Sequence, residues 1–194
     1  MVKLTMKTKF FSSILAFTLL MAPRVLAETY NFDEGQSEIG FKIGHFGGQA
    51  KGVFKEFKGT LEFDEKNPQD SKVDLVIQVD SIDTGSAKRD AHLQREEYFD
   101  SGQFPTITFE SRAFRKRGSV FFVTGPLTIH GVEKNITLKV RLKGRQAQWT
   151  TGGDALTFDS QYELSRLDFG VSGGQPAVGK TVEIDLNIKA FEET

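Results

Sequence analysis

The sequence predicts an all-β protein: an antiparallel arrangement of eight strands with one short helical insertion. Three observations support this fold class. Apolar residues recur at every second position along most of the chain, which is the period of strands that bury one face. Clusters of turn-forming residues separate these runs. A helical period occurs in one segment alone, residues 86–97.

Residues 1–27 are predicted to be a cleavable export signal. Three lysines precede the apolar run Phe10–Ala22, and Val25-Leu26-Ala27 provides a small-residue cleavage site. The run has 13 residues, whereas a membrane-spanning helix needs about 20, so no integral membrane span is expected after signal removal. The signal has a bacterial composition, which predicts a periplasmic protein with one domain at residues 28–194.

Charge and composition exclude several function classes. The export signal holds four basic and no acidic residues, so residues 28–194 carry 21 Lys and Arg against 26 Asp and Glu, a net charge of −5. Nucleic-acid binding depends on clustered Lys and Arg, so no nucleic-acid partner is expected. Because the chain has no cysteine, disulfides, thiolate nucleophiles and cysteine metal ligands are excluded.

Eight alternating runs make up the predicted strands. In chain order their apolar residues span Ile39–Ile43, Phe57–Phe63, Val73–Val79, Ile107–Phe109, Val120–Ile129, Ile136–Leu142, Phe158–Leu164 and Val182–Ile188. Eight strands with one apolar face can close into an up-and-down barrel or pack as a two-layer sandwich, and alternation does not decide between them. The choice matters because an eight-stranded barrel can hold one small ligand in its interior.

The insertion between the third and fourth runs is the main candidate for a ligand site. In Ser86–Glu97, residues Arg89, His92, Leu93 and Glu96 lie three and four positions apart and could share one face of a short helix. Binding residues are often found on irregular segments that a rigid scaffold positions. The sequence therefore predicts that residues which determine ligand specificity lie in this insertion.

Three short motifs resemble enzyme or modification signals without the context that these signals need. Gly174–Thr181 matches the phosphate-binding pattern G-x-x-x-x-G-K-T, but a strand follows it where a helix is required. Gly170–Gly174 spells G-x-S-x-G without the α/β fold of a nucleophile elbow. Asn135-Ile136-Thr137 is a glycosylation sequon only in a eukaryotic secretory setting.

The three histidines, His45, His92 and His130, are far apart in the sequence and form no metal-binding pair. We expect no metal site and no catalytic residues. If the protein were instead a metal-independent enzyme with a site in its interior, these histidines would be its only plausible general bases.

Several blocks, taken in order, resemble the YceI-like family of polyisoprenoid-binding, lipocalin-like exported proteins. They are Tyr30–Asp33, Ser37–His45, Ser81–Thr84, Arg89–Leu93, Phe104–Ser111, Gly125–Val132 and Arg166–Val171. Gln36 and Lys180 depart from this pattern, since many relatives carry a histidine and an acid there. The resemblance implies an extended eight-stranded antiparallel lipocalin-like barrel whose lumen accommodates an isoprenoid lipid, either a polyprenyl phosphate or an isoprenoid quinone, and implies no other cofactor.

Strand phase and this resemblance together predict the ligand-binding residues. The expected lumen residues are Ile39, Phe41, Ile43, Leu75, Ile77, Phe109, Phe122, Leu138, Phe158, Tyr162, Ile184 and Leu186. At the mouth, Arg89 is the first choice to bind a phosphate headgroup because its planar guanidinium donates in pairs, with Lys88 and His92 as helpers. The alternative role for Arg89 is structural: an ion pair with Asp90, Glu96 or Asp168 that pins the insertion.

Other functions stay open at the level of sequence. A barrel with a packed interior could act in a stress response or in partner binding. A lipid carrier could make transient contact with a membrane or with a lipid-handling protein. The sequence does not determine the oligomeric state, a dimer included.

Overall fold

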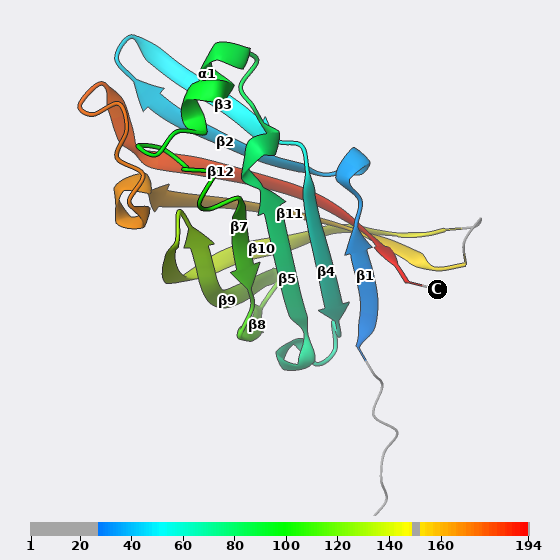
Figure 1. The fold of residues 1–194 in the computed structure, drawn as a ribbon. Helices are drawn as coiled ribbons and strands as arrows, with labels where there is room; N and C mark the ends of the chain where they lie inside the picture. Colours follow the sequence, from blue (N-terminus) through cyan, green and yellow to red (C-terminus); the bar gives the residue numbers. More distant parts are fainter. Residues whose placement is uncertain (1–26, 149–151, 194) are drawn as a thin grey trace, which may run out of the picture.

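One antiparallel β-sheet forms the protein and closes on itself (Figure 1). The structure, a computed structural model, describes residues 27–148 and 152–193. The strands are β1 (Glu28–Phe32), β2 (Glu38–His45), β3 (Gly48–Phe54), β4 (Phe57–Phe63), β5 (Lys72–Gln78), β6 (Ile82–Asp83), β7 (Thr106–Glu110), β8 (Ala113–Arg117), β9 (Val120–Ile129), β10 (Val132–Ala147), β11 (Asp154–Ser165) and β12 (Val178–Glu192). The α-helix α1 spans Ala87–Leu93, and four 3-10 turns lie at Glu34–Gln36, Pro68–Asp70, Val79–Ser81 and Arg166–Phe169.

Eight strands form a closed ring, which confirms the barrel and excludes the sandwich. The order around the ring is β1, β4, β5, β7, β9, β10, β11 and β12, and β12 then pairs with β1. In this closing pair Tyr30 lies opposite Glu192 and Phe32 lies opposite Ala190. Closure joins residues that are more than 150 positions apart in the chain, and alternation within single strands contains no information about such a pairing.

The barrel is extended because three further strands, β2, β3 and β6, continue the sheet beyond the eight-stranded ring. β2 follows β1 after a 3-10 turn and pairs with residues 178–187 of β12, while β3 pairs with β2 and with β6. The wall made by β2, β3 and β6 reaches beyond the closed ring, and α1 lies at that same end (Figure 1). The fold therefore has an end bearing the β2–β3 turn and α1, and an opposite end bearing the β4–β5 and β10–β11 turns.

All eight predicted runs are strands, namely β2, β4, β5, β7, β9, β10, β11 and β12. The runs did not include β1, β3, β6 and β8. β3 contains two glycines and two polar residues and β8 contains three basic residues, so neither shows apolar alternation. The helix is shorter than residues 86–97, because turn hydrogen bonds such as Phe99 N to Leu93 O follow its C-cap Gln94.

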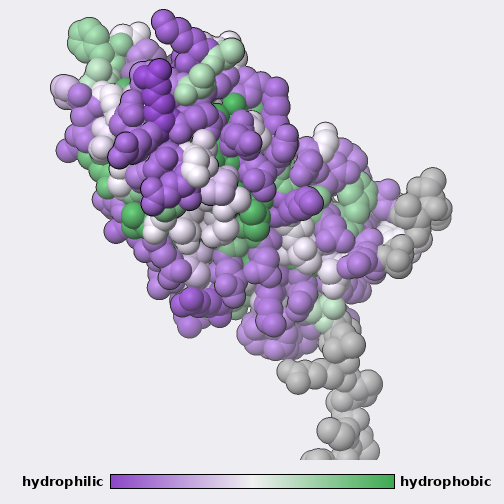
Figure 2. Space-filling model, in the orientation of Figure 1, coloured by the Kyte–Doolittle hydropathy of each residue, from purple (hydrophilic) through white to green (hydrophobic). Residues whose placement is uncertain are grey.

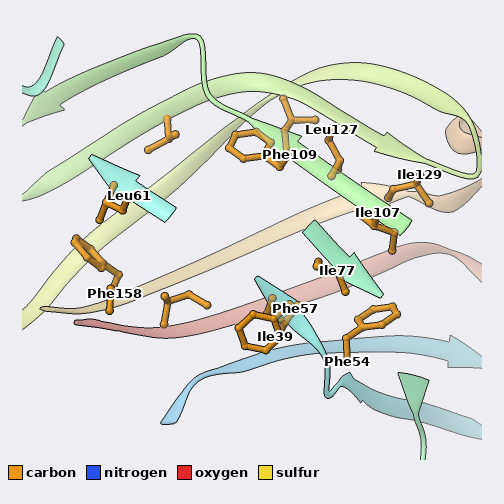
Figure 3. Packing of buried hydrophobic residues seen from close by; sticks show 14 of the residues in the cluster. Ile39, Phe54, Phe57, Leu61, Ile77, Ile107, Phe109, Leu127, Ile129 and Phe158 are labelled. Atoms are coloured by element: carbon orange, nitrogen blue, oxygen red, sulfur yellow. The ribbon is translucent and has the colours of Figure 1, made fainter. Parts of the chain in front are cut away.

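Inward-facing aliphatic and aromatic side chains form the core. Figure 3 shows Ile77, Ile107 and Phe109 pointing into the barrel from neighbouring strands. At one end of the interior the ring of Phe63 lies edge-on to Phe121 and to Phe158, with centroids 5.4 and 5.6 Å apart. These three rings form an aromatic cluster inside the barrel at that end.

Two glycines in the wall leave space for phenyl rings. Gly52 lies directly opposite Phe41 on the paired strand, and the ring of Phe41 occupies the volume where a Cβ of residue 52 would be. Gly59 accommodates the ring of Phe32 in the same way. Both rings therefore pack closely against the wall of the barrel.

Gly59→Ala is expected to destabilise the protein by about 1–3 kcal/mol, since the new methyl group overlaps the ring of Phe32 and forces a rearrangement of the core. Urea denaturation measures the change. Gly144→Ala is the matched control, because a Cβ there meets no atom within 4 Å. Equal stability of the two variants would show that the ring does not depend on the glycine.

Candidate functional site

Three apolar cavities follow one another inside the barrel, and a larger pocket opens beyond them. The inner cavity has a volume of about 80 Å³ and lies on the aromatic cluster of Phe63, Phe121 and Phe158. The middle cavity has about 90 Å³ and the throat cavity about 120 Å³. The outer pocket has about 490 Å³ and lies at the end that carries α1.

Each of these spaces adjoins the next, because neighbouring cavities share wall residues. The inner and middle cavities share Leu75, Phe109, Leu138 and Leu186. The middle and throat cavities share Phe54, Ile107, Ile129, Leu164 and Ile184. The throat cavity and outer pocket share Phe41, Ile43, Leu93, Tyr98 and Val178. A narrow apolar path therefore runs along the barrel from the outer pocket to the aromatic cluster.

Eleven of the twelve residues predicted for the lumen line this path. They are Ile39, Phe41, Ile43, Leu75, Ile77, Phe109, Leu138, Phe158, Tyr162, Ile184 and Leu186. The structure places these side chains in the walls of the cavities, and their role in ligand binding stays a prediction.

The placement of Phe122 in the lumen is wrong. Its neighbours Phe121 and Val123 are each 2% exposed and line the inner cavity, so Phe122 points to the outer face of β9. There its ring lies 5.8 Å from the guanidinium of Arg117. The four consecutive apolar residues Val120–Val123 give no indication of the strand phase at this position.

Ion pairs cover the end of the barrel beyond the inner cavity. Arg145 Nη1 lies 2.7 Å from Asp154 Oδ2, and the same guanidinium is 3.8 Å from both Glu28 and Glu65. The fully buried Tyr30 donates its hydroxyl to Glu28 Oε2 at 2.6 Å, and burial, followed by this bond, raises the pKa of Tyr30. A second pocket of about 560 Å³, lined by charged residues that include Glu28, Glu65 and Arg145, opens at that end and shares Phe63 with the inner cavity.

The three residues predicted for the mouth, Lys88, Arg89 and His92, all line the outer pocket. Arg89 makes no ion pair with a neighbouring acid among the described residues: its Nε donates to Thr84 Oγ1 and its Nη2 to Thr84 O, both at 2.7 Å. Asp90 instead accepts from Thr84 N and Thr84 Oγ1, at 2.9 and 2.6 Å. These bonds fix the guanidinium and leave its charge unneutralised.

The histidines do not form one group. His45 and His92 line the outer pocket, and His92 Nε2 lies 3.6 Å from Glu97 Oε1. His130 is not among the residues that line the pocket, and its ring packs on Phe104 with centroids 4.9 Å apart. Within residues 27–148 and 152–193, no set of three or more His, Asp or Glu residues is arranged to hold a metal ion.

Arg166 is a site residue that sequence reasoning missed. It is 5% exposed, lines the throat cavity and donates to the carbonyls of Gly179 (2.7 Å), Gly173 (2.7 Å), Val171 (2.9 Å) and Val178 (3.2 Å). Burial lowers the pKa of its guanidinium. The sequence contains one indication of this position: Arg166 follows Leu164 by two residues, so it falls on the inward-facing side of the strand pattern. It also precedes a glycine-rich segment, residues 170–179.

Tyr98 joins the insertion to that glycine-rich segment. Its ring occupies the space beside Gly173, and Gly173 N donates to Glu97 O at 2.6 Å. Tyr98 lines both the throat cavity and the outer pocket, and its ring lies edge-on to His92 at 5.0 Å. It therefore stands at the boundary between the narrow path and the pocket.

Ser160→Ala is expected to stabilise the protein by about 1 kcal/mol. The hydroxyl of Ser160 is buried in the wall of the inner cavity and has no hydrogen-bond partner among the described residues, while its cross-strand neighbours are Val140 and Leu186. Removing an unpaired buried hydroxyl removes its desolvation cost.

Ser111→Ala is the matched control for this effect. Ser111 is also buried, but its Oγ accepts from Val73 N at 2.8 Å, so its loss should destabilise by about 1–2 kcal/mol. Urea denaturation compares the two variants. A loss of stability of the same size in both would contradict the difference in hydrogen bonding.

Comparison with known proteins identifies a family and relatives that this chain resembles. Residues 30–190 match the YceI-like domain family. Protein YceI of Salmonella arizonae is 34% identical over 191 residues, which cover 97% of this chain and 100% of that protein. In the part of the chain that the structure describes, no helix is long and apolar enough to span a membrane.

Two solved structures of other proteins share the fold. Burkholderia cenocepacia BcnA superposes with a TM-score of 0.74 at 24% identity, covering 81% of this chain and 98% of BcnA. A polyisoprenoid binding domain from Saccharophagus degradans, implicated in plant cell wall breakdown, gives a TM-score of 0.67 at 15% identity and covers 87% of this chain and 100% of that domain.

Proposed function

Because this chain belongs to the YceI-like domain family, we propose that it is a periplasmic protein that sequesters or carries an isoprenoid lipid. The lipid tail lies in the inner, middle and throat cavities. The headgroup class is a polyprenyl phosphate or an isoprenoid quinone. The observation that carries this proposal is the row of adjoining apolar cavities that leads from the outer pocket to the aromatic cluster.

The energetics of burial favour such a ligand. Moving a methylene-sized group from water to an apolar site gains about 0.8 kcal/mol, so one five-carbon isoprene unit gains roughly 4 kcal/mol before ordering costs. A few units therefore suffice for tight binding. The cavities are narrow, and an unbranched or methyl-branched chain fits their shape better than a wide ring system does.

The outer pocket supplies donors for an anionic headgroup. Lys88 and Arg89 are exposed, line the pocket and carry charges that no carboxylate among the described residues neutralises. A phosphate bound here would receive charge-assisted hydrogen bonds from Arg89, with Lys88 and His92 beside it.

Binding is favoured over catalysis by the histidine positions. An enzyme in the lumen needs titratable groups that converge on a substrate, and His130 lies away from the pocket that His45 and His92 line.

The proposed export signal, residues 1–27, lies outside the described residues apart from Ala27, and the proposed domain comprises residues 28–194.

The test is to identify what copurifies with the mature protein. The protein is isolated from periplasmic extract, examined by native mass spectrometry and extracted with organic solvent. We expect an isoprenoid in the extract, and a rise in melting temperature when isoprenoid is added to the stripped protein, since ligands that bind the folded state stabilise it. An empty protein whose melting temperature does not change with added isoprenoid would contradict the proposal.

A further inference from the structure

One aromatic side chain of the described residues is almost completely exposed. Phe46, in the turn between β2 and β3, is 92% exposed, and within residues 27–148 and 152–193 the only other exposed large hydrophobic residue is Val76, at 38%. The β2–β3 turn lies at the same end of the molecule as α1 (Figure 1), and Figure 2 shows an apolar group protruding there. A single exposed apolar side chain is common on protein surfaces, so the place of this ring matters more than its exposure.

The backbone holds this ring in a defined place. Phe46 N donates to Ala177 O at 2.7 Å, and the ring Nδ1 of His45 lies 3.0 Å from Phe46 O. Phe46 and Ala177 both line the outer pocket. The backbone of Phe46 is therefore held at the rim of the outer pocket, and its ring projects from that rim into solvent.

The charge on this rim is opposite to that of the chain as a whole. Residues 28–194 carry a formal net charge of −5. Yet the outer pocket is lined by Lys88, Arg89 and two histidines, and no Asp or Glu is among its described lining residues. An aromatic anchor beside cations matches the two components of an anionic lipid surface, its acyl region and its headgroups.

We propose that the rim of the outer pocket docks on an anionic bilayer surface. Phe46 enters the boundary between headgroups and acyl chains, and Lys88 and Arg89 contact lipid phosphates. The pocket then faces the bilayer, so a lipid tail passes between membrane and throat cavity without crossing water. This inference extends the proposed carrier function, which would otherwise leave the exposed ring without a role.

The expected strength is modest and reversible. One partly inserted phenyl ring should contribute about tenfold to vesicle partitioning, and one cation near an anionic surface about fivefold. Salt should weaken the electrostatic part, because surface charges are screened within about 8 Å at physiological ionic strength.

Flotation of the mature protein with vesicles tests the docking. One set of vesicles contains 30 mol% phosphatidylglycerol in phosphatidylcholine, and the other contains phosphatidylcholine alone. Wild type should bind the anionic vesicles at least fivefold better. Phe46→Ser should lower partitioning about tenfold and Lys88→Gln about fivefold.

Two variants serve as matched controls. Val76→Ser removes the other exposed apolar side chain, and Lys139→Gln removes an exposed cation on the outer face of β10. Both should float like wild type. Docking is overturned if Phe46→Ser floats as well as Val76→Ser, if the two vesicle types bind equally, or if wild type floats with neither and captures only a protein partner.

Failure of docking is distinguishable from failure of the carrier function. Binding of isoprenoid to wild type in detergent micelles is measured in parallel. Isoprenoid binding without flotation overturns the docking and leaves the carrier proposal standing. Flotation with Phe46 dependence but without isoprenoid binding supports the docking and overturns the carrier proposal.

Discussion

Leu186→Trp is expected to abolish binding of long isoprenoids while short ones still bind. Leu186 lines both the inner and the middle cavity, so an indole at this position fills the space where the two adjoin. Chains that need the inner cavity must leave their last units in water. Affinity should fall about tenfold or more for each displaced five-carbon unit, after ordering costs are subtracted.

The measurement is a series of dissociation constants for isoprenoids of increasing length with the same headgroup. Overpacking should cost about 1–3 kcal/mol of stability, so folding of the variant is checked by circular dichroism and urea denaturation. Phe122→Trp is the control, because Phe122 faces outward and an indole there leaves the cavities unchanged. A uniform loss at every length, or no loss at all, would contradict the assignment of the lumen.

Arg166→Met is expected to destabilise the protein by about 3–5 kcal/mol. Four backbone carbonyls, those of Val171, Gly173, Val178 and Gly179, accept from this guanidinium, and removing it leaves these acceptors without their charged donor. Arg166→Lys should recover little, because an ammonium cannot reach four acceptors that are arranged around a planar fork.

Urea denaturation measures the loss, with Arg141→Met as the control. Arg141 forms an exposed ion pair with Asp159 at 3.0 Å, an interaction that contributes little at a solvated surface. Isoprenoid affinity should also fall in Arg166→Met, since the glycine-rich segment forms part of the throat. If Arg166→Met were as stable as Arg141→Met, the buried hydrogen bonds would not hold the throat together.

Much of the fold could be predicted because strand alternation is a local property. The runs around Phe41, Leu61 and Ile184 each identify a strand and its buried face without knowledge of the partner strand. The closed ring could not be derived in this way, since it depends on the pairing of Tyr30 with Glu192. The resemblance to the YceI-like family, and not the periodicity, supplied the barrel.

The candidate site could be predicted from the sequence to about the same extent as the fold. Lys88, Arg89 and His92 could be placed together because helical spacing is also local. The turn that brings Phe46 to the same rim depends on a tertiary contact, the bond from Phe46 N to Ala177 O, which no local pattern predicts. Phe122 was misplaced because consecutive apolar residues hide the phase of a strand. Arg166 was overlooked because a buried cation without an acid partner departs from the usual pattern of burial.

The most direct test of the central claim is a crystal structure of the mature protein with an isoprenoid bound. The account predicts continuous density for the tail from the outer pocket past Tyr98, through the region of Leu138 and Leu186, to the rings of Phe121 and Phe158. Density confined to the outer surface, with lining side chains filling the cavities between Phe41 and Phe158, would contradict it.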